Sequence, residues 1–291
     1  MYEIVLFGGD IRQIYMAQYF RALDYSVITY GLSHPLIQDI CKQASSFQEA
    51  ISLGSILIGP IPLSNDQTNI PSLTSCSDLN LDTLLDTIRK DQVLFAGMIS
   101  TSVVEYCDKN QIICYDFMKE DSVAIANGIA TAEGAIMEAI GKSTGNLHKS
   151  STLVLGFGRC AKILAHKLDG LDAYVTVCAR NDSDLAYAEA FGYETCTLCD
   201  LPAKINSYSY IFNSIPYMVL SKELLYQVSK DTTIIDIASS PGGLDYSTAR
   251  ALNLNASLSL GIPGKVAPKA SAKLLANYCL KKLSCRKKVS P

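Results

Sequence analysis

Histidine is scarce in this sequence of 291 residues, and its cysteines follow no regular spacing. The three histidines are His34, His148 and His166, and the one Cys196-x-x-Cys199 pair has no second pair to complete it. Because a structural zinc ion needs four ligands, no metal site is expected. The ten cysteines are expected to be reduced and mostly small core residues.

The sequence also has little charge imbalance and no long apolar run. Its net charge is −3, and basic residues gather only in the tail, between Lys281 and Lys288. This distribution does not favour nucleic-acid binding. Gly, Pro or charged residues interrupt every apolar run before about 18 positions, so no membrane span is expected. The N-terminus, MYEIVLFGGD, has no basic region before its first apolar run, which predicts a cytoplasmic protein without a signal peptide.

What the sequence does contain is enough apolar material for two domains. Hydrophobic residues make up 48% and charged residues 18%, as in ordinary globular proteins. Short β-rich runs alternate with helical patterns, which predicts α/β domains whose parallel sheets are covered on both faces. We expect two open parallel-sheet domains, flavodoxin-like at the N-terminus and Rossmann-type at the C-terminus, joined by a long connecting helix.

Four segments follow from this pattern. Residues 1–118 form the flavodoxin-like, substrate-side domain, and 119–150 form the connecting helix and linker. Residues 151–264 form the Rossmann domain, and 265–291 form a loop and helix that return to the N-terminal domain. In the first domain, strands are expected at Glu3–Gly8, Ser26–Gly31, Ser55–Pro60, Val93–Ile99 and Ile112–Tyr115.

The most informative stretch is STLVLGFGRCA, Ser151–Ala161. A β-rich run breaks into Gly156-x-Gly158-x-x-Ala161 and opens onto an apolar-periodic segment, which is the G-x-G-x-x-A form of the dinucleotide fingerprint. Gly156 allows the turn, Gly158 lets the backbone approach a pyrophosphate, and Ala161 lets helix and strand pack closely. The helix start, with Arg159, would hold the pyrophosphate through its N–H groups. A bland strand-to-helix turn could use the same glycines.

Arg180 ends the next β-rich run and bears on the choice of cofactor. An Asp or Glu there binds the ribose 2′-hydroxyl of NAD, whereas an Arg accommodates the 2′-phosphate of NADP. Arg180 therefore favours NADP, with NAD possible if Asp182 or Asp184 takes the acidic role.

Two later strand ends are expected beside the nicotinamide half of the cofactor. Asn213-Ser214-Ile215-Pro216 follows one strand, and Ala238-Ser239 opens the Gly-rich loop after the next. Ligands of such sheets bind beside the carboxyl ends of the strands.

Outside the Rossmann domain, the first turn and the connecting helix carry further polar candidates. Asp10 either caps the helix after it or faces the substrate, and Arg12 is either a substrate contact or a surface charge. Glu133, near Thr131 in the connecting helix, is either a cleft carboxylate or an ordinary helix-surface residue.

Taken together, these stretches resemble the A subunit of dipicolinate synthase from spore-forming bacteria. The residues that carry the resemblance are FGGDIRQ (7–13), TAEGAI (131–136), GFGRCA (156–161), NSIP (213–216), DIASSPGGLD (236–245) and GIPGKVAPK (261–269). They span nearly the whole chain in order. The resemblance implies a partner, the flavoprotein B subunit, and the oxidation of dihydrodipicolinate to dipicolinate in the mother-cell cytoplasm during sporulation. A homo-oligomer is also expected.

The implied reaction places few chemical demands on the protein. Aromatisation drives it, so the enzyme must orient a hydride acceptor and bind two carboxylates. Arg12, Lys265 and Lys269 are the candidate cations, with Thr131 beside the substrate. Asp10 or Glu133 could take the ring proton, with Lys265 as a further catalytic group. Lys265 and Lys269 could instead be surface charges at a helix entry.

Three functions remain open from the sequence. They are a dipicolinate-forming oxidoreductase subunit, a stand-alone NADP-dependent dehydrogenase of a small imino or hydroxy acid, and a non-catalytic nucleotide-binding scaffold for the flavoprotein. The related D-2-hydroxy-acid dehydrogenases use a late histidine as base, and none of the three histidines follows the fifth strand of the Rossmann domain.

Overall fold

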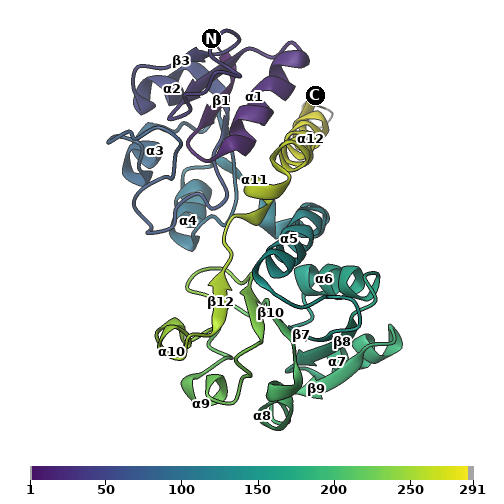
Figure 1. The fold of residues 1–291 in the computed structure, drawn as a ribbon. Helices are drawn as coiled ribbons and strands as arrows, with labels where there is room; N and C mark the ends of the chain where they lie inside the picture. Colours follow the sequence, from purple (N-terminus) through teal and green to yellow (C-terminus); the bar gives the residue numbers. More distant parts are fainter. Residues whose placement is uncertain (1, 288–291) are drawn as a thin grey trace. The chain divides into compact units, whose positions relative to one another are not determined.

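The computed structural model describes residues 2–287 and divides the chain into two compact units (Figure 1). Unit 1 comprises Met1–Ala126 with Ala267–Pro291, and unit 2 comprises Asn127–Val266. The division falls inside the long helix α5 (Asp121–Lys142), which connects the two units. The chain returns to unit 1 at Ala267, directly before α12 (Pro268–Lys287).

Unit 1 is built on a parallel sheet of six strands in the order β3-β2-β1-β4-β5-β6. The strands are β1 (Tyr2–Phe7), β2 (Val27–Tyr30), β3 (Lys42–Gln43), β4 (Gly54–Ile58), β5 (Val93–Ala96) and β6 (Ile113–Asp116). Without the two-residue β3, which has no apolar signal, this is the flavodoxin-like order that the sequence predicted. Apart from α12 and the start of α5, the helices of unit 1 are α1 (Ile11–Ala22), α2 (Phe47–Leu53), α3 (Leu81–Thr87), α4 (Thr101–Lys109) and the 3-10 helix η1 (Phe117–Lys119).

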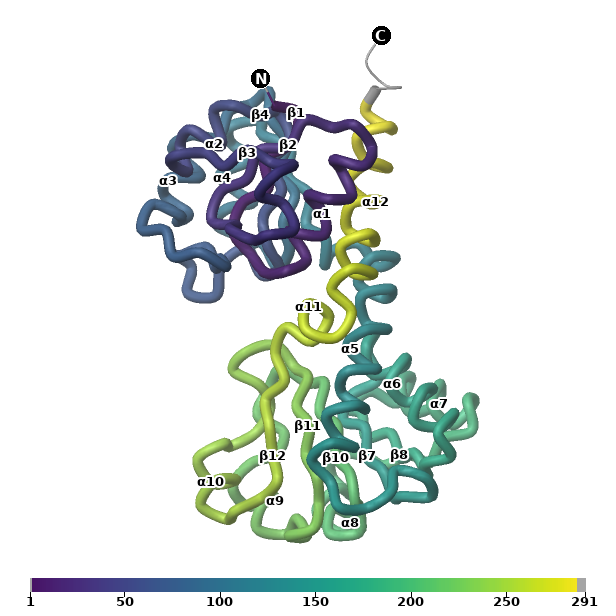
Figure 2. Tube along the Cα trace, turned by 45° about the horizontal axis from the view of Figure 1, so that its top comes forward, coloured from purple at the N-terminus to yellow at the C-terminus, as the bar shows by residue number. Residues whose placement is uncertain are grey.

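Both faces of the unit 1 sheet are buried. Along β1, Ile4 and Leu6 join one core with α1 and α12, whereas Val5 and Phe7 join another with α2 and α3. A strand alternates its side chains between faces, so a continuous apolar run is what a sheet covered on both sides requires. The tube in Figure 2 shows α12 running alongside α1, with which it packs.

Unit 2 holds a second parallel sheet, in the order β12-β11-β10-β7-β8-β9. The strands are β7 (Ser151–Leu155), β8 (Tyr174–Ala179), β9 (Glu194–Thr197), β10 (Tyr210–Asn213), β11 (Thr233–Asp236) and β12 (Asn255–Leu258). The helices are α6 (Arg159–Asp169), α7 (Asp182–Ala190), α8 (Leu201–Lys204), η2 (Ile205–Ser207), α9 (Lys222–Leu225), α10 (Tyr246–Ala251) and α11 (Ile262–Val266). This is the Rossmann strand order, and the connection reverses between β7 and β10.

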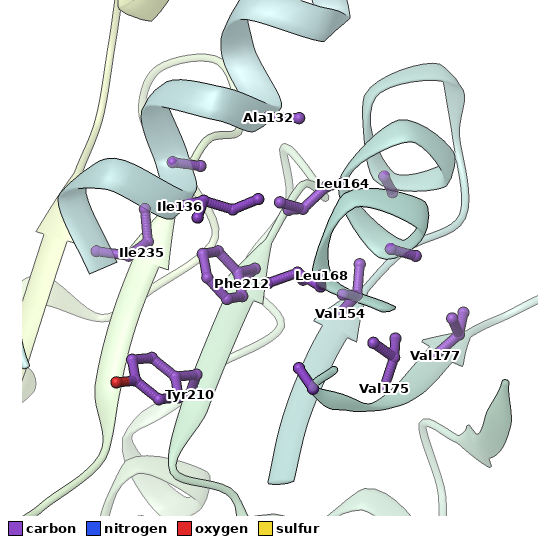
Figure 3. Close-up of a cluster of buried hydrophobic side chains, with 14 of the residues drawn as sticks. Ala132, Ile136, Val154, Leu164, Leu168, Val175, Val177, Tyr210, Phe212 and Ile235 are labelled. Carbon is purple, nitrogen blue, oxygen red and sulfur yellow. The ribbon is translucent and has the colours of Figure 1, made fainter. Parts of the chain in front are cut away.

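The larger core of unit 2 lies between this sheet and helices α5 and α6. Phe212 of β10 projects toward Ile136 of α5 and Leu164 and Leu168 of α6 (Figure 3). Helix α5 approaches α11 closely because Gly134 has no side chain, and a Cβ there would collide with Ile262. The packing of α5 against α11 thus depends on one glycine.

Helix α5 is also the one helix in residues 2–287 that is long and apolar enough to cross a membrane by length and composition. Its best window has a mean hydropathy of 1.3, and 61% of that window is buried inside the protein. The sequence predicted no such stretch, because Gly, Pro and charged residues, here Gly128 and Glu133, were counted as interruptions. Burial of most of the window is what a core helix shows, so the finding is weak evidence for a span.

All ten cysteines are free thiols. Cys107, Cys178 and Cys279 are fully buried in the cores, whereas Cys114 is half-buried. Within the described part of the chain, no group of three or more His, Cys, Asp or Glu side chains is placed to hold a metal ion.

Candidate functional site

The turn between β7 and α6 has the backbone that the glycine fingerprint requires. Gly156 has a φ of +91°, a conformation that glycine adopts readily, and its N–H donates to the Cys178 carbonyl oxygen over 2.8 Å. A Cβ at Gly156 would lie 2.6 Å from Ser214 Oγ. Position 156 therefore has room for hydrogen only.

Gly158 plays a different part, as the N-cap residue of α6. No side chain caps this helix, and a Cβ at Gly158 would meet no described atom within 4 Å apart from its chain neighbours. Arg159 opens the first helical turn, and Ala161 is fully buried against the sheet. An uncapped helix start beside open space suits an anion, since its N–H groups and dipole both favour negative charge.

The end of β10 forms the neighbouring wall of this turn. The N–H and Oγ of Ser214 both donate to the Leu155 carbonyl oxygen, over 3.0 and 2.8 Å. Asn213 itself is fully buried, and its amide bonds Ile215 and Asp236. The sequence predicted that Asn213 faces the cofactor, whereas its side chain is engaged within the protein. Ile215 is half-buried and Pro216 is exposed.

The end of β11 holds a buried carboxylate that the sequence reasoning did not single out. Asp236 accepts hydrogen bonds from the N–H groups of Ala238 and Gly243, from Asn213 Nδ2 and from the Tyr246 hydroxyl. Burial, followed by the bond to Asp236, raises the pKa of Tyr246 well above its usual range. The signal in the sequence was an acid at a strand end followed by a Gly-Gly pair.

Three further residues of the predicted cofactor site are Ala238 and Ser239, which follow β11, and Arg180, which follows β8. Ser239 is exposed, one residue after the buried Ala238. Arg180 is exposed directly after β8. The two acids that could serve NAD instead, Asp182 and Asp184, lie in the first turn of α7.

In the first turn of unit 1, between β1 and α1, Asp10 and Arg12 form an ion pair. Asp10 caps α1, and its side chain accepts a hydrogen bond from the Arg12 backbone N–H over 2.9 Å. The same carboxylate accepts bidentate hydrogen bonds from Arg12 Nε and Nη2. Arg12 Nη2 further donates to the Ile61 carbonyl oxygen over 3.0 Å. Arg12 is only 3% exposed, so it is neither the surface charge nor the fully available cation that the sequence offered as alternatives. Its Nη1 has no partner among the described residues.

Three polar residues of the connecting helix α5 have different surroundings. Glu133 forms an exposed ion pair with Lys167 of α6 over 2.9 Å. Thr131 Oγ1 donates to the Asn127 carbonyl oxygen, and Asn127 Oδ1 is the one buried side-chain acceptor in residues 2–287 without a partner.

Glu138, one turn further along α5, was missed by the sequence reasoning. It accepts from Ser257 and Ser259 at the end of β12, over 2.9 and 2.5 Å. Burial opposes ionisation, but these bonds and Lys142 outweigh it and lower the pKa of Glu138. Glu138 ties α5 to the edge strand.

The two candidate lysines belong to different units. Lys265 is exposed on α11 of unit 2. Lys269 is exposed on α12 of unit 1, where it lines a pocket of about 250 Å³ with Tyr15, Gln18, Tyr19 and Lys273. The structure thus brings the nucleotide candidates together around β7, β8, β10 and β11, and joins Asp10 to Arg12.

This fold and turn define a class. A Rossmann sheet with an open glycine turn at its reversal point, coupled to a second parallel-sheet unit, is the architecture of a dehydrogenase-like protein. Phosphoglycerate oxidoreductase from Vibrio cholerae shares the fold, with a TM-score of 0.64 at 12% identity over 98% of this chain and all of that one.

Closer matches are to A subunits of dipicolinate synthases. Residues 3–118 match the model of the N-terminal domain of the dipicolinate synthase A subunit. The chain is 28% identical to the A subunit of dipicolinate synthase from Bacillus subtilis, over 97% of its own length and 96% of the relative's. The crystal structures of that protein and of its Bacillus halodurans counterpart each match with a TM-score of 0.83 at 27% identity, over 97% of this chain and 96% and 97% of theirs. The predicted resemblance to this family is confirmed.

Proposed function

We propose that this chain is the nucleotide-binding subunit of a two-protein oxidoreductase. With a flavoprotein B subunit, it converts dihydrodipicolinate to dipicolinate in the mother-cell cytoplasm during sporulation, using NADP or NAD. The observation that carries the proposal is the similarity to the A subunit of a dipicolinate synthase along 97% of the chain. The complex contains both proteins, and this chain also forms a homo-oligomer.

The residues of the β7–α6 turn fit a nicotinamide nucleotide. The uncapped start of α6 and the open side of Gly158 suit its pyrophosphate, and Arg180 suits a 2′-phosphate. A bound oxidised nicotinamide would supply the hydride acceptor for the dihydropyridine ring, whose aromatisation also releases a proton. The protein's task is to orient the ring, hold its carboxylates and receive that proton.

The substrate contacts are proposed residue by residue. Arg12 Nη1, Lys265 and Lys269 are the cations for the two carboxylates, with Thr131 as a neutral partner. Asp10 is the preferred base, because its side chain is 39% exposed even though Arg12 holds it. Glu133 is the weaker candidate, since Lys167 already neutralises it.

One observation favours a second candidate function. Both candidate bases, Asp10 and Glu133, are already ion-paired in the structure. A non-catalytic scaffold that binds nucleotide while the flavoprotein performs the chemistry would need neither. A stand-alone NADP-dependent dehydrogenase would instead need Arg180 and a free base.

Reconstitution separates a two-protein function from a stand-alone dehydrogenase. The chain and its flavoprotein partner are mixed with dihydrodipicolinate and NADP or NAD, and dipicolinate is followed by its ultraviolet absorbance. The proposal requires product with both proteins and nucleotide present, and none with either protein alone. Product from the flavoprotein alone would overturn it, and product from this chain alone would favour the stand-alone dehydrogenase.

Arg180 should set the cofactor preference. We expect Arg180→Asp to reverse a preference for NADP over NAD, because a 2′-phosphate would then meet a carboxylate. Loss of one charge-assisted hydrogen bond costs about 1.5–3 kcal/mol, or roughly 10- to 150-fold in NADP affinity. Calorimetric titration of both nucleotides measures this, with the exposed Arg250→Asp as the matched control. Tighter NAD binding by the unmodified protein would contradict the assignment.

Lys265 should affect turnover and leave nucleotide affinity alone. Lys265→Ala is expected to lower dipicolinate formation by the reconstituted pair by roughly 10- to 150-fold, the effect of one lost charge-assisted bond. The NADP dissociation constant should stay within about threefold of the unmodified value, since this residue is outside the pyrophosphate turn. Lys222→Ala, another exposed lysine of unit 2, is the control. Unchanged turnover would make Lys265 a surface charge.

A further inference from the structure

Asn213 and Asp236 lie at the ends of neighbouring strands, and both are fully buried. They face each other directly, with Asn213 Nδ2 donating to Asp236 Oδ1 over 2.9 Å. Neither touches the open side of the glycine turn. Their arrangement nevertheless determines the shape of the loops beside it.

Asp236 organises the loop that follows its own strand. A buried carboxylate without a cation is costly unless hydrogen bonds satisfy it, and every partner of Asp236 in the described chain is a neutral donor. The Ala238 and Gly243 N–H groups bind it over 2.9 and 2.6 Å, and the Tyr246 hydroxyl binds it over 2.6 Å. Two ends of one loop are thereby tied to a single side chain.

Asn213 does the same for the loop after β10, and it needs both ends of its amide. Nδ2 donates to the Ile215 carbonyl oxygen over 3.0 Å, while Oδ1 accepts from the Ile215 N–H over 3.1 Å. The carboxylate of Asp236 admits only the N–H end of the amide, so it also sets the orientation in which Asn213 meets Ile215. An ionised aspartate at position 213 could not donate.

This pair reaches the nucleotide turn through one more residue. Ser214 sits between Asn213 and Ile215, bonds the last carbonyl of β7, and closes the space beside Gly156. From the other side, Gly243 leaves room for the pair, since a Cβ there would collide with Asn213 Nδ2 and lie 2.7 Å from the Ile215 carbonyl oxygen. Asn213 and Asp236 therefore fix the position of Ser214 and Ile215, which form the wall of the glycine turn, from its buried side.

We propose that Asn213 and Asp236 are positioning residues for dinucleotide binding, which fix the Ser214–Ile215 wall without touching the cofactor. This inference rests on the nucleotide binding in the proposed function. It replaces the direct cofactor contact that the sequence predicted for Asn213.

The test uses Asn213→Asp, whose effect should depend on pH. Burial and the neighbouring Asp236 both raise the pKa of the introduced carboxyl. At low pH its proton supplies the missing donor, and as pH rises through that raised pKa the proton is lost and two carboxylates repel. Tyr246 is the other titratable group bonded to this pair, and it stays neutral across the range. We expect the NADP dissociation constant, as a ratio to the unmodified protein at the same pH, to be near threefold or less at pH 5 and above tenfold at pH 8.

Two variants make the result specific. Asn213→Ala lacks both donor and charge, so its ratio should exceed tenfold at both pH values, and it keeps the test valid if the introduced carboxyl prevents folding. Tyr210→Phe removes a hydroxyl from the same strand, one that bonds the Gly145 carbonyl oxygen at the opposite end. Tyr210→Phe should lower the midpoint of thermal unfolding, and its NADP dissociation constant should stay near that of the unmodified protein at both pH values.

The outcomes separate the two claims. If the unmodified protein binds neither nucleotide, the proposed function fails and this inference fails with it. If it binds and Asn213→Ala binds equally well, the inference alone is overturned. A loss by Asn213→Asp that is the same at both pH values would show that a general structural defect, and not the missing donor, weakens binding.

Discussion

Replacing Gly158 with valine is expected to abolish nucleotide binding while leaving the fold intact. The φ of Gly158 is −78°, an ordinary value for any residue, and its missing side chain points into open space. A branched side chain would fill that space and displace a pyrophosphate from the N–H groups of α6. We expect NADP affinity to fall by more than about 100-fold, which corresponds to roughly 2.8 kcal/mol.

The control for this prediction lies at the other end of the same helix. Gly170 closes α6, and a Cβ there would make an ordinary contact of 3.5 Å with the His166 carbonyl oxygen. Gly170→Val should keep nucleotide affinity. Since the sequence has no tryptophan, binding is best followed by calorimetry or by the fluorescence of NADPH. Retained binding by Gly158→Val would show that the glycine fingerprint is only a turn.

Replacing Arg12 with alanine is expected to destabilise unit 1 by about 2–4 kcal/mol. The substitution removes a buried guanidinium that bonds Asp10 and the Ile61 carbonyl oxygen, and it leaves the latter without its donor. The partial exposure of Asp10 keeps the loss below that of a fully buried pair. Such a loss is a large part of the roughly 5–15 kcal/mol that a domain usually has.

Urea unfolding followed by circular dichroism measures this effect, with the two units allowed separate transitions. Arg21→Ala is the matched control, because Arg21 is exposed on the same helix and its side chain donates to the Tyr25 carbonyl oxygen, an exposed bond. It should cost less than about 1 kcal/mol. If Arg12→Ala keeps its stability but loses turnover in the reconstituted pair, Arg12 acts mainly on substrate and not on the fold.

Much of the fold was readable from local sequence. A few consecutive residues are enough to predict a strand or a helix. The apolar runs of β1 and β10 and the Gly156–Ala161 turn could therefore be placed without the structure. The elements that the sequence did not predict were short and had no apolar pattern of this kind. β3 has two exposed residues, and α9 and α11 have four and five.

The sequence by itself determined the fold class, the nucleotide turn and the resemblance to a family, because each is carried by short stretches of consecutive residues. Only the tertiary structure decided what the polar side chains do. Arg12 is buried because the Ile61 carbonyl comes from beyond β4, the strand beside β1, and Glu133 is paired because α6 brings Lys167 to it. Asn213 and Asp236 are 23 residues apart and meet only through the register of β10 with β11. Partners of this kind are set by strand pairing and helix packing, which no local pattern encodes.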